Sequence, residues 1–161
     1  MYTLSNIFIY PIKGCAGISL DVAEVFDRGL QYDRRWMLVD GNGRFISQRS
    51  HPQLALIETA IIDGWLFVSY EDDSHQIPLV SDYKDHQEVI VWDDQFKAYV
   101  ASPVDSQWFS NHLDTEVTLV AMQEDSHRPV DPRYAVSQQE EVSFADGYPF
   151  LVIGNPAMTL L

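Results

Sequence analysis

Short runs of β-branched and aromatic residues alternate with turn-forming residues along most of this chain of 161 residues. Runs of this kind, bounded by Gly, Pro, Asn and Asp, are typical of short antiparallel strands. The pattern predicts strands over residues 2–10, 20–26, 34–40, 44–49, 54–62, 65–70, 88–93, 96–101 and 116–122. The run over 20–26 changes phase between Val22 and Val25, which we interpret as a β-bulge.

Turn signals join three pairs of these strands. The sequence DGNG at residues 40–43 predicts a hairpin, because Asn-Gly tolerates the positive φ values that tight turns require. Asp63-Gly64 and Asp94-Gln95 predict two further turns. The acidic pairs Asp72-Asp73 and Asp93-Asp94 fall at turns, where solvated carboxylates are the simplest interpretation.

One helix is predicted after these strands. Ser102 is a suitable N-cap and Pro103 suits the first helical position. Asp105 follows in the first turn, where the helix dipole favours an acidic side chain. Trp108 and Phe109 then begin an apolar face. Many short strands with one helix predict a mainly β fold, an antiparallel barrel or sandwich with one or two short helices.

The chain after residue 122 is expected to differ from the strands before it. Residues 123–142 are polar and contain two prolines, which predicts a long loop. The sequence of residues 143–154 predicts a strand that is kinked at Gly-Tyr-Pro, residues 147–149. Asn155 and Pro156 begin a helix with room for only about one and a half turns, too short to be stable alone. We therefore expect a second unit that is cut short, with a docked C-terminal helix as the alternative.

The formal net charge of −14 limits the classes of partner. Binding to nucleic acid or to anionic membranes needs clustered Lys and Arg, so the composition predicts neither. No apolar run approaches the roughly 20 residues of a membrane-spanning helix. The single cysteine excludes an internal disulfide and fits a cytoplasmic location.

The basic residues are unevenly distributed along the chain. Residues 1–49 hold six of the ten basic residues, namely Lys13, Arg28, Arg34, Arg35, Arg44 and Arg49. The same segment holds only five acidic residues, so it is close to neutral within an acidic protein. It either forms a local anion site or simply carries its basic residues on long strands.

Few residues have the spacing of a catalytic or metal site. The five histidines are scattered without zinc-ligand spacing, and there is no phosphate-binding glycine motif, so we predict no metal ligands and no catalytic residues in this chain. Cys15, two residues from Lys13, is either a nucleophile or metal ligand or, as we prefer, a small buried residue.

Lys13 and the Arg34-Arg35 pair are better candidates for binding. Lys13 precedes Gly14 where a strand ends, and a lysine beside exposed backbone N–H groups suits an anion such as phosphate. One arginine can pair with Asp33 while the other binds a phosphate in a bidentate manner. A surface ion pair beside a half-buried tryptophan is the alternative.

Four motifs in order carry a resemblance to a known family. They are YPIK-x-C from Tyr10, DR-x-W from Asp33, G-x-F-x-x-x-R-x-x-P from Gly43 and F-x-D-x-x-P-F-L from Phe144. In this order they resemble MOSC-domain proteins, named after the C-terminal domain of molybdenum cofactor sulfurase, and above all the amidoxime-reducing branch. The resemblance implies an N-terminal antiparallel β-barrel over residues 1–122, a loop over 123–142 and the beginning of a truncated MOSC domain over 143–161.

The resemblance also implies a cofactor and its contacts. The family binds a molybdenum cofactor, a pterin that carries a phosphate. Lys13 and Arg34 match family residues that contact the cofactor, and Tyr148 falls at a contacting position where a small polar residue is common. Gly14 replaces a serine and leaves only its backbone N–H. Cys15 does not match the cysteine that binds molybdenum, which lies in a part of the family absent from this chain.

These matches imply an enzyme, with two alternatives. The complete protein would reduce N-hydroxylated or related N–O small molecules with electrons from a reductase or ferredoxin, while these 161 residues alone, a fragment, would be inactive. The chain could instead be a non-catalytic module that recognises a substrate or delivers cofactor or sulfur. The third possibility is a structural barrel in which the Lys13 turn only connects strands.

Overall fold

The computed structural model describes residues 3–137 and 139–154. The strands are β1 Ile7–Ile9, β2 Ile18–Leu20, β3 Val25–Phe26, β4 Gly29–Leu30, β5 Trp36–Val39, β6 Glu58–Ile62, β7 Trp65–Tyr70, β8 Asp73–Pro78, β9 His86–Val91, β10 Asp94–Val100 and β11 Thr118–Ala121. One α-helix, α1, spans Pro103–Leu113, and a 3-10 helix spans Pro52–Leu56. Every ladder between these strands is antiparallel, which confirms the mainly β, antiparallel fold with short helices.

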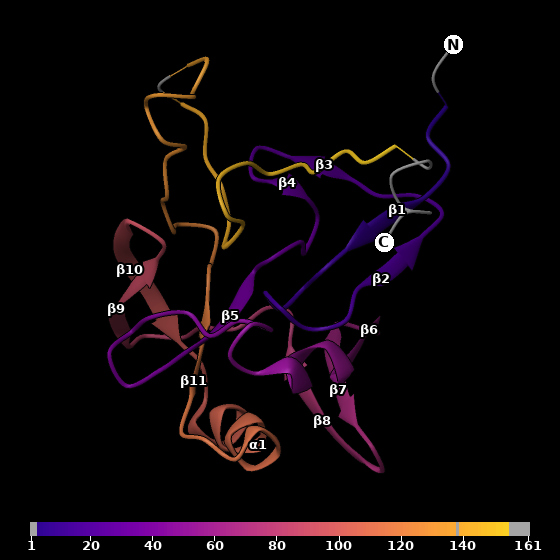
Figure 1. The fold of residues 1–161 in the computed structure, drawn as a ribbon, viewed down its shortest axis with the longest axis vertical. Coiled ribbons are helices and arrows are strands. Elements are labelled where there is room, and N and C mark those ends of the chain that lie inside the picture. The colour runs from indigo at the N-terminus through magenta and orange to yellow at the C-terminus, as the bar shows by residue number, and fades with distance from the viewer. Residues whose placement is uncertain (1–2, 138, 155–161) are drawn as a thin grey trace.

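The strands form a central sheet with smaller sheets around it (Figure 1). Its order is β5-β11-β10-β9, and the smaller sheets are β6-β7-β8, β1-β2 and β3-β4. In the described part of the chain these sheets are not joined into one closed ring of ladder hydrogen bonds. No helix among the described residues is long and apolar enough to cross a membrane.

Both faces of the central sheet are buried, because successive residues of a strand point to opposite faces. On one face, Leu38 joins a core with the β6-β7-β8 sheet and α1. On the other face, Met37 packs among residues of β9 and β10 and against the fully buried Phe144. The segment around Phe144 is therefore attached to the sheet by its own apolar side chain.

Local turn and cap signals led to correct predictions. Gly43 N donates to Asp40 O at 2.9 Å and has a φ of +75°, as expected for the DGNG turn, but the strand predicted after it over residues 44–49 was wrong, because only Arg44 and Phe45 form isolated bridges there. Ser102 caps α1 and accepts a hydrogen bond from Val104 N, with Pro103 in the first turn. The turn at Asp63-Gly64 also lies between β6 and β7, as predicted.

Several predicted elements were wrong. Residues 54–56 form a 3-10 helix begun by Pro52, not a strand, and the run over 20–26 contains two separate strands in place of one bulged strand. The turn between β9 and β10 lies at Trp92-Asp93, two residues earlier than predicted, because Asp94 pairs with Val91 in the ladder. The strand over Asp73–Pro78 was missed.

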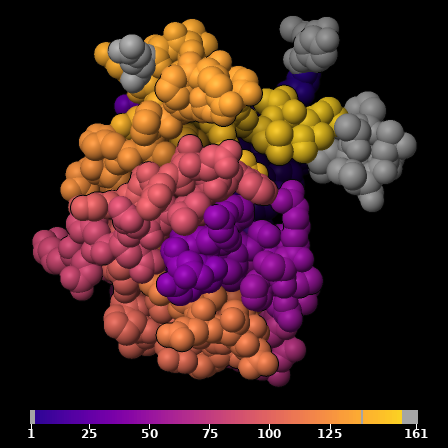
Figure 2. Space-filling model, turned by 60° about the vertical axis from the view of Figure 1, so that its left-hand side comes forward, coloured from indigo at the N-terminus to yellow at the C-terminus, as the bar shows by residue number. Residues whose placement is uncertain are grey.

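The segment after β11 is a long packed loop (Figures 1 and 2). Residues 123–142 contain no strand beyond one isolated bridge between Pro129 and Glu141 in the part that the structure describes, which agrees with the predicted loop. Residues 143–154 also form no strand, so the strand predicted there was wrong. The helix predicted from Asn155 lies outside the described residues.

Candidate functional site

Lys13 projects from a tight turn that follows β1. Its backbone N–H donates to Trp36 O at 2.9 Å, and Cys15 N donates to Ile12 O at 3.1 Å, which closes the turn. Gly14 lies inside the turn with a φ of +89°, a conformation in which most side chains are strained. The fully buried Ile12 fixes the base of the turn. The main chain therefore holds Lys13 at a defined place between the sheets.

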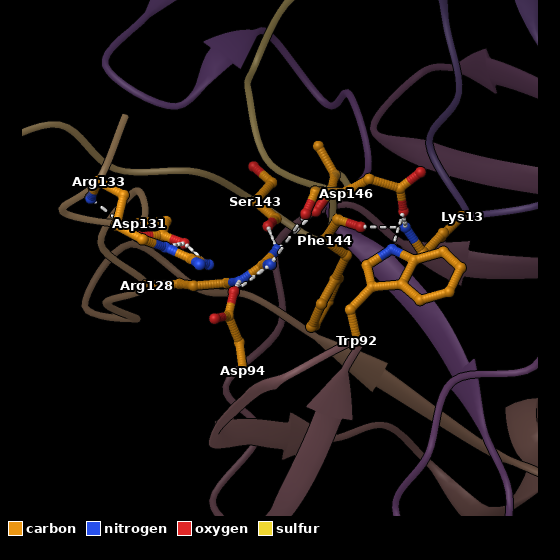
Figure 3. A network of polar contacts seen from close by, with 10 residues as sticks. Lys13, Trp92, Asp94, Arg128, Asp131, Arg133, Ser143, Phe144 and Asp146 are labelled. Carbon is orange, nitrogen blue, oxygen red and sulfur yellow. Dashed lines mark hydrogen bonds and ion pairs between the residues drawn. The ribbon is translucent and has the colours of Figure 1, made fainter. Parts of the chain in front are cut away.

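The ammonium group of Lys13 is nearly enclosed. Nζ donates to Phe144 O at 2.8 Å and to Asp146 Oδ1 at 2.5 Å (Figure 3). It also lies 5.0 Å from the centre of the Phe45 ring. Only 12% of the side chain is exposed. Burial lowers the pKa of Lys13, and the Asp146 carboxylate offsets part of that effect. Lys13 thus links the barrel to a segment more than a hundred residues later in the chain.

Trp92 donates to the same carboxylate oxygen as Lys13. Its indole Nε1 lies 2.9 Å from Asp146 Oδ1. Trp92 has a φ of +55°, which is unfavourable for a bulky side chain, so packing and hydrogen bonding hold it there. The indole lies edge-on to Phe45, and the Arg49 guanidinium lies 5.3 Å from its centre. A cation, an indole N–H and an aromatic wall therefore surround one oxygen.

Asp146 is held in its charged form. Burial alone would raise the pKa of Asp146, but the hydrogen bonds from Lys13 and Trp92 outweigh it and leave the pKa below its ordinary value. The Asp146 side chain is nevertheless 70% exposed. Because the Asp146 carboxylate lies at the surface, it can rotate toward solvent without rearrangement of the core.

Arg34 approaches the same place from the start of β5. Its guanidinium pairs with Asp33 and is close enough to Lys13 and Asp146 to lower the pKa of both. Arg34 has a φ of +48°, and its backbone is held on two sides: N donates to Tyr10 O at 2.8 Å, and O accepts from Phe144 N at 3.0 Å. The structure therefore brings Lys13 and Arg34, far apart in sequence, to one site.

Arg128 is a structural part of this site that the sequence pattern did not reveal. Its side chain is 2% exposed, and NH1 donates to Ser143 O at 2.7 Å and to Ala145 O at 2.6 Å (Figure 3). NH2 donates to Asp94 at 2.6 Å. These bonds bind the backbone that carries Asp146. The only sequence signal was an arginine before a proline in a polar loop.

Two acids that we predicted to be solvated turn residues have specific partners. Asp94 forms the ion pair with Arg128. Asp73 accepts hydrogen bonds from Trp108 Nε1 and His112 Nε2, each at 2.9 Å, and so fastens β8 to α1. Their partners lie more than thirty residues away, so local turn chemistry could not reveal them.

The other residues singled out in the sequence, Cys15, Gly14 and Tyr148, have different partners from Lys13 and Arg34. Cys15 is 1% exposed, and burial raises the pKa of its thiol to about 12, as the preferred interpretation of a small buried residue requires. Gly14 O accepts from Gln48 Nε2 at 2.7 Å, while its N–H has no acceptor among the described residues. Tyr148 donates to Tyr134 O at 3.2 Å and forms no hydrogen bond with Lys13 in the described part of the chain.

The arrangement fits the anionic end of a phosphate-bearing cofactor. Two donors, the Lys13 ammonium and the Trp92 indole, already converge on one anionic oxygen, that of Asp146. Arg34 adds a second cation beside them. A phosphate oxygen could replace the Asp146 oxygen and gain the same charge-assisted hydrogen bonds.

Comparisons with known proteins agree with this architecture. The profile of the family described as MOSC N-terminal beta barrel domain matches residues 1–116. The chain is 31% identical over 131 residues to a molybdenum cofactor sulfurase of Oryza sativa subsp. japonica, covering 78% of this chain and 16% of that protein. It is 27% identical over 168 residues to mitochondrial amidoxime reducing component 2 of Rattus norvegicus, covering 97% of this chain and 49% of that protein. The chain therefore spans less than half the length of these relatives.

A similar fold is found in a solved structure. The solution structure of a protein from Bordetella bronchiseptica superimposes with a TM-score of 0.51, covering 66% of this chain and 92% of that chain. The two sequences are 17% identical in the aligned region. At this identity the likeness concerns the fold alone.

Proposed function

This chain belongs to the MOSC N-terminal β-barrel domain family, and on that premise we propose that it is the cofactor-anchoring part of a molybdenum-cofactor oxidoreductase. The substrates are small N-hydroxylated or related N–O compounds, and a reductase or ferredoxin supplies the electrons. The likeness to the rat amidoxime reducing component along nearly the whole chain supports this reaction class.

The observation that carries the proposal is the convergence of Lys13 and Trp92 on one oxygen of Asp146. Lys13 and Trp92 would hold a cofactor phosphate where they now hold the Asp146 carboxylate, which is exposed enough to turn toward solvent. Lys13 and Arg34 would neutralise the phosphate charge, and the turn at Gly14 offers a backbone N–H that has no acceptor within the described residues.

The roles of these residues are binding and orientation. When bound, the molybdenum cofactor supplies the metal at which an N–O bond is reduced. Lys13 holds its proton beside the phosphate, because a neighbouring anion favours the charged form of a lysine. The backbone bond from Phe144 N to Arg34 O keeps both cations beside residues 143–146, and Phe45 and Trp92 keep water from one side of the phosphate.

The test measures the cofactor content of the protein expressed from its complete reading frame. Bound pterin is released by oxidation and counted by fluorescence in Lys13→Ala, Arg34→Ala and the wild type. We expect the content to fall at least tenfold in each variant, because each loses a charge-assisted contact to phosphate. Lys84→Ala and Arg133→Ala are matched controls, since both side chains are exposed and pair with neighbouring acids. If Lys13→Ala and Arg34→Ala both contain as much pterin as the wild type, these residues do not anchor the cofactor.

A non-catalytic module that delivers cofactor or sulfur is the second candidate function. The higher identity to the rice cofactor sulfurase supports it. The two candidates differ in turnover, which is measured as reduction of benzamidoxime by the loaded protein with a chemical electron donor. Turnover above that of the cofactor-free protein favours the reductase. Cofactor binding without turnover, followed by transfer of cofactor or sulfur to an acceptor protein, favours the module.

A further inference from the structure

Asp146 takes up the hydrogen-bond donors of the Lys13 site. Its Oδ1 accepts from Trp92 Nε1 at 2.9 Å and from Lys13 Nζ at 2.5 Å (Figure 3). An indole has a single N–H group, so Trp92 can give a full hydrogen bond to only one acceptor at a time. Any other anion that binds to Trp92 must therefore displace the Asp146 carboxylate.

The ammonium group of Lys13 is occupied in the same way. It has three protons, of which Phe144 O accepts one at 2.8 Å and Asp146 Oδ1 accepts another. Only 12% of the Lys13 side chain is exposed, which leaves little room for a further partner. An incoming anion therefore gains a close contact with Lys13 by replacing the Asp146 carboxylate.

The backbone that carries Asp146 is fixed without help from its carboxylate. Arg128, whose side chain is 2% exposed, donates to Ser143 O at 2.7 Å and to Ala145 O at 2.6 Å. Phe144 is fully buried against the central sheet. These contacts hold residues 143–145, so the Asp146 carboxylate is not needed to attach this segment to the barrel.

The Asp146 side chain has room to leave its donors. It is 70% exposed, and beyond the chain neighbours of Gly147 no described atom lies within 4 Å of the place that a Cβ on Gly147 would take. A carboxylate that rotates into water regains hydration, which offsets part of the hydrogen bonding that it loses. The donors thus stay in place while the acceptor can be exchanged.

We propose that Asp146 is a built-in competitor for the anion site, which raises the concentration of any phosphate that is needed to fill it. This rests on the function proposed above, in which Lys13, Arg34 and Trp92 bind a phosphate monoester. A ligand that must displace an internal partner binds with an affinity reduced by the fraction of protein in which the site is free. Asp146 thereby excludes weakly held anions such as inorganic phosphate, whereas a pterin phosphate offers further groups for contact.

The test is a titration of the full chain with inorganic phosphate at pH 7, followed by NMR of the Trp92 indole N–H. Its signal is assigned by its loss in Trp92→Phe, or by elimination among the other tryptophans if that variant does not fold. Asp146→Ala and Asp146→Asn should each bind phosphate at least about tenfold more tightly than the wild type, because both remove the competing charge. Asp72→Ala removes a charge from an exposed turn and should change the affinity by less than about twofold.

The sign of the change separates competition from a purely structural role. If Asp146 only orders Lys13, both Asp146 variants should bind phosphate as weakly as the wild type or more weakly, and the proposal is wrong. A gain in Asp146→Asn alone would also refute it, because the asparagine amide can donate to phosphate directly.

A double variant connects the gain to this site. Adding Lys13→Ala to Asp146→Ala should weaken phosphate binding at least about tenfold, since it removes a charge-assisted contact. If the double variant binds as tightly as Asp146→Ala, the gain arises elsewhere and the proposal is wrong. If the Asp146 variants gain nothing while Lys13→Ala still loses pterin, the competitor role fails and the anchoring role stands.

Discussion

At the scale of single residues, the two groups that follow Pro11 illustrate how burial decides chemistry. Lys13 is almost enclosed but keeps two oxygen partners, whereas Cys15, two residues later, is enclosed among apolar side chains. A buried cation with acceptors is a binding group, and a buried thiol without a nearby cation is inert. The position of a reactive side chain in the sequence is therefore a poor guide to its reactivity.

The thiol of Cys15 is expected to be unreactive in the folded protein. Burial raises its pKa to about 12, so at pH 8 almost none of it is thiolate, and the side chain is 1% exposed. Iodoacetamide at pH 8 should modify it at least a hundredfold more slowly than it modifies the same chain in urea. Mass spectrometry of the intact chain counts the modified fraction. Comparable rates in the two conditions would contradict the buried position.

At the scale of elements, Arg128 explains why residues 143–146 lie where they do. Backbone carbonyls that would pair with a neighbouring strand instead accept hydrogen bonds from Arg128 and Lys13. Arg28 acts similarly on the preceding loop, donating to Gln123 O at 3.0 Å and to Glu124 O at 2.6 Å. The long segment after β11 is thus attached by buried cations as well as by Phe144.

Arg128→Met should detach residues 143–146 from the barrel. Methionine fills a similar volume but leaves the carbonyls and Asp94 without a donor, which we expect to cost about 3 kcal/mol of unfolding free energy. Hydrogen exchange at the Phe144 amide should accelerate more than exchange in the central sheet. Arg133→Met, where the side chain is 75% exposed, should leave the stability unchanged. Equal effects of the two variants would refute this role.

The elements also show how far the sequence could predict the structure. The DGNG turn and the Ser102 cap were predicted correctly, because their determinants lie within a few residues. The turn at Trp92-Asp93 and the loop over 143–154 were mispredicted because partners far along the chain decide them, the ladder register in one case and Arg128 in the other.

The sequence predicted only part of the candidate site, for the same reason. The motifs identified Lys13 and Arg34, and the structure brings both to Asp146. They did not identify Trp92, Asp146 or Arg128 as partners, because single-sequence patterns carry no information on contacts across a barrel. Tyr148 matched a motif position, yet its hydroxyl donates to Tyr134 O.

At the scale of the whole molecule, the net charge of −14 makes the response to acid informative. Protonation of many carboxylates relieves their mutual repulsion, which opposes the loss of individual ion pairs at low pH. The contribution of one carboxylate is therefore best measured as a difference between two proteins across a pH range.

Asp146 should contribute to stability in a pH-dependent manner. Its pKa in the folded protein is below the ordinary value of 3.8, so its contribution is present above about pH 4 and disappears as the pH falls through the folded pKa. Asp146→Asn should therefore lose about 0.5–1 kcal/mol of unfolding free energy at pH 7, discounted for exposure, and nothing near pH 2. Urea unfolding at several pH values measures this difference.

The comparison for Asp146 is Asp72→Asn, at an exposed turn position without a hydrogen-bond partner among the described residues. Its difference from the wild type should stay below about 0.5 kcal/mol at every pH. A difference for Asp146→Asn that is constant from pH 7 to pH 2 would show that its bonds to Lys13 and Trp92 do not depend on its charge.

The order of the central sheet also affects how the chain folds during synthesis. Trp36 to Val39 pair with Thr118 to Ala121, so the first strand of this sheet finds its ladder partner in the last one. On the ribosome, β5 must wait with its apolar residues exposed until β11 has emerged, and such long-range pairing is slow. The β6-β7-β8 hairpins, formed from consecutive residues, can assemble earlier and cover part of this surface in the meantime.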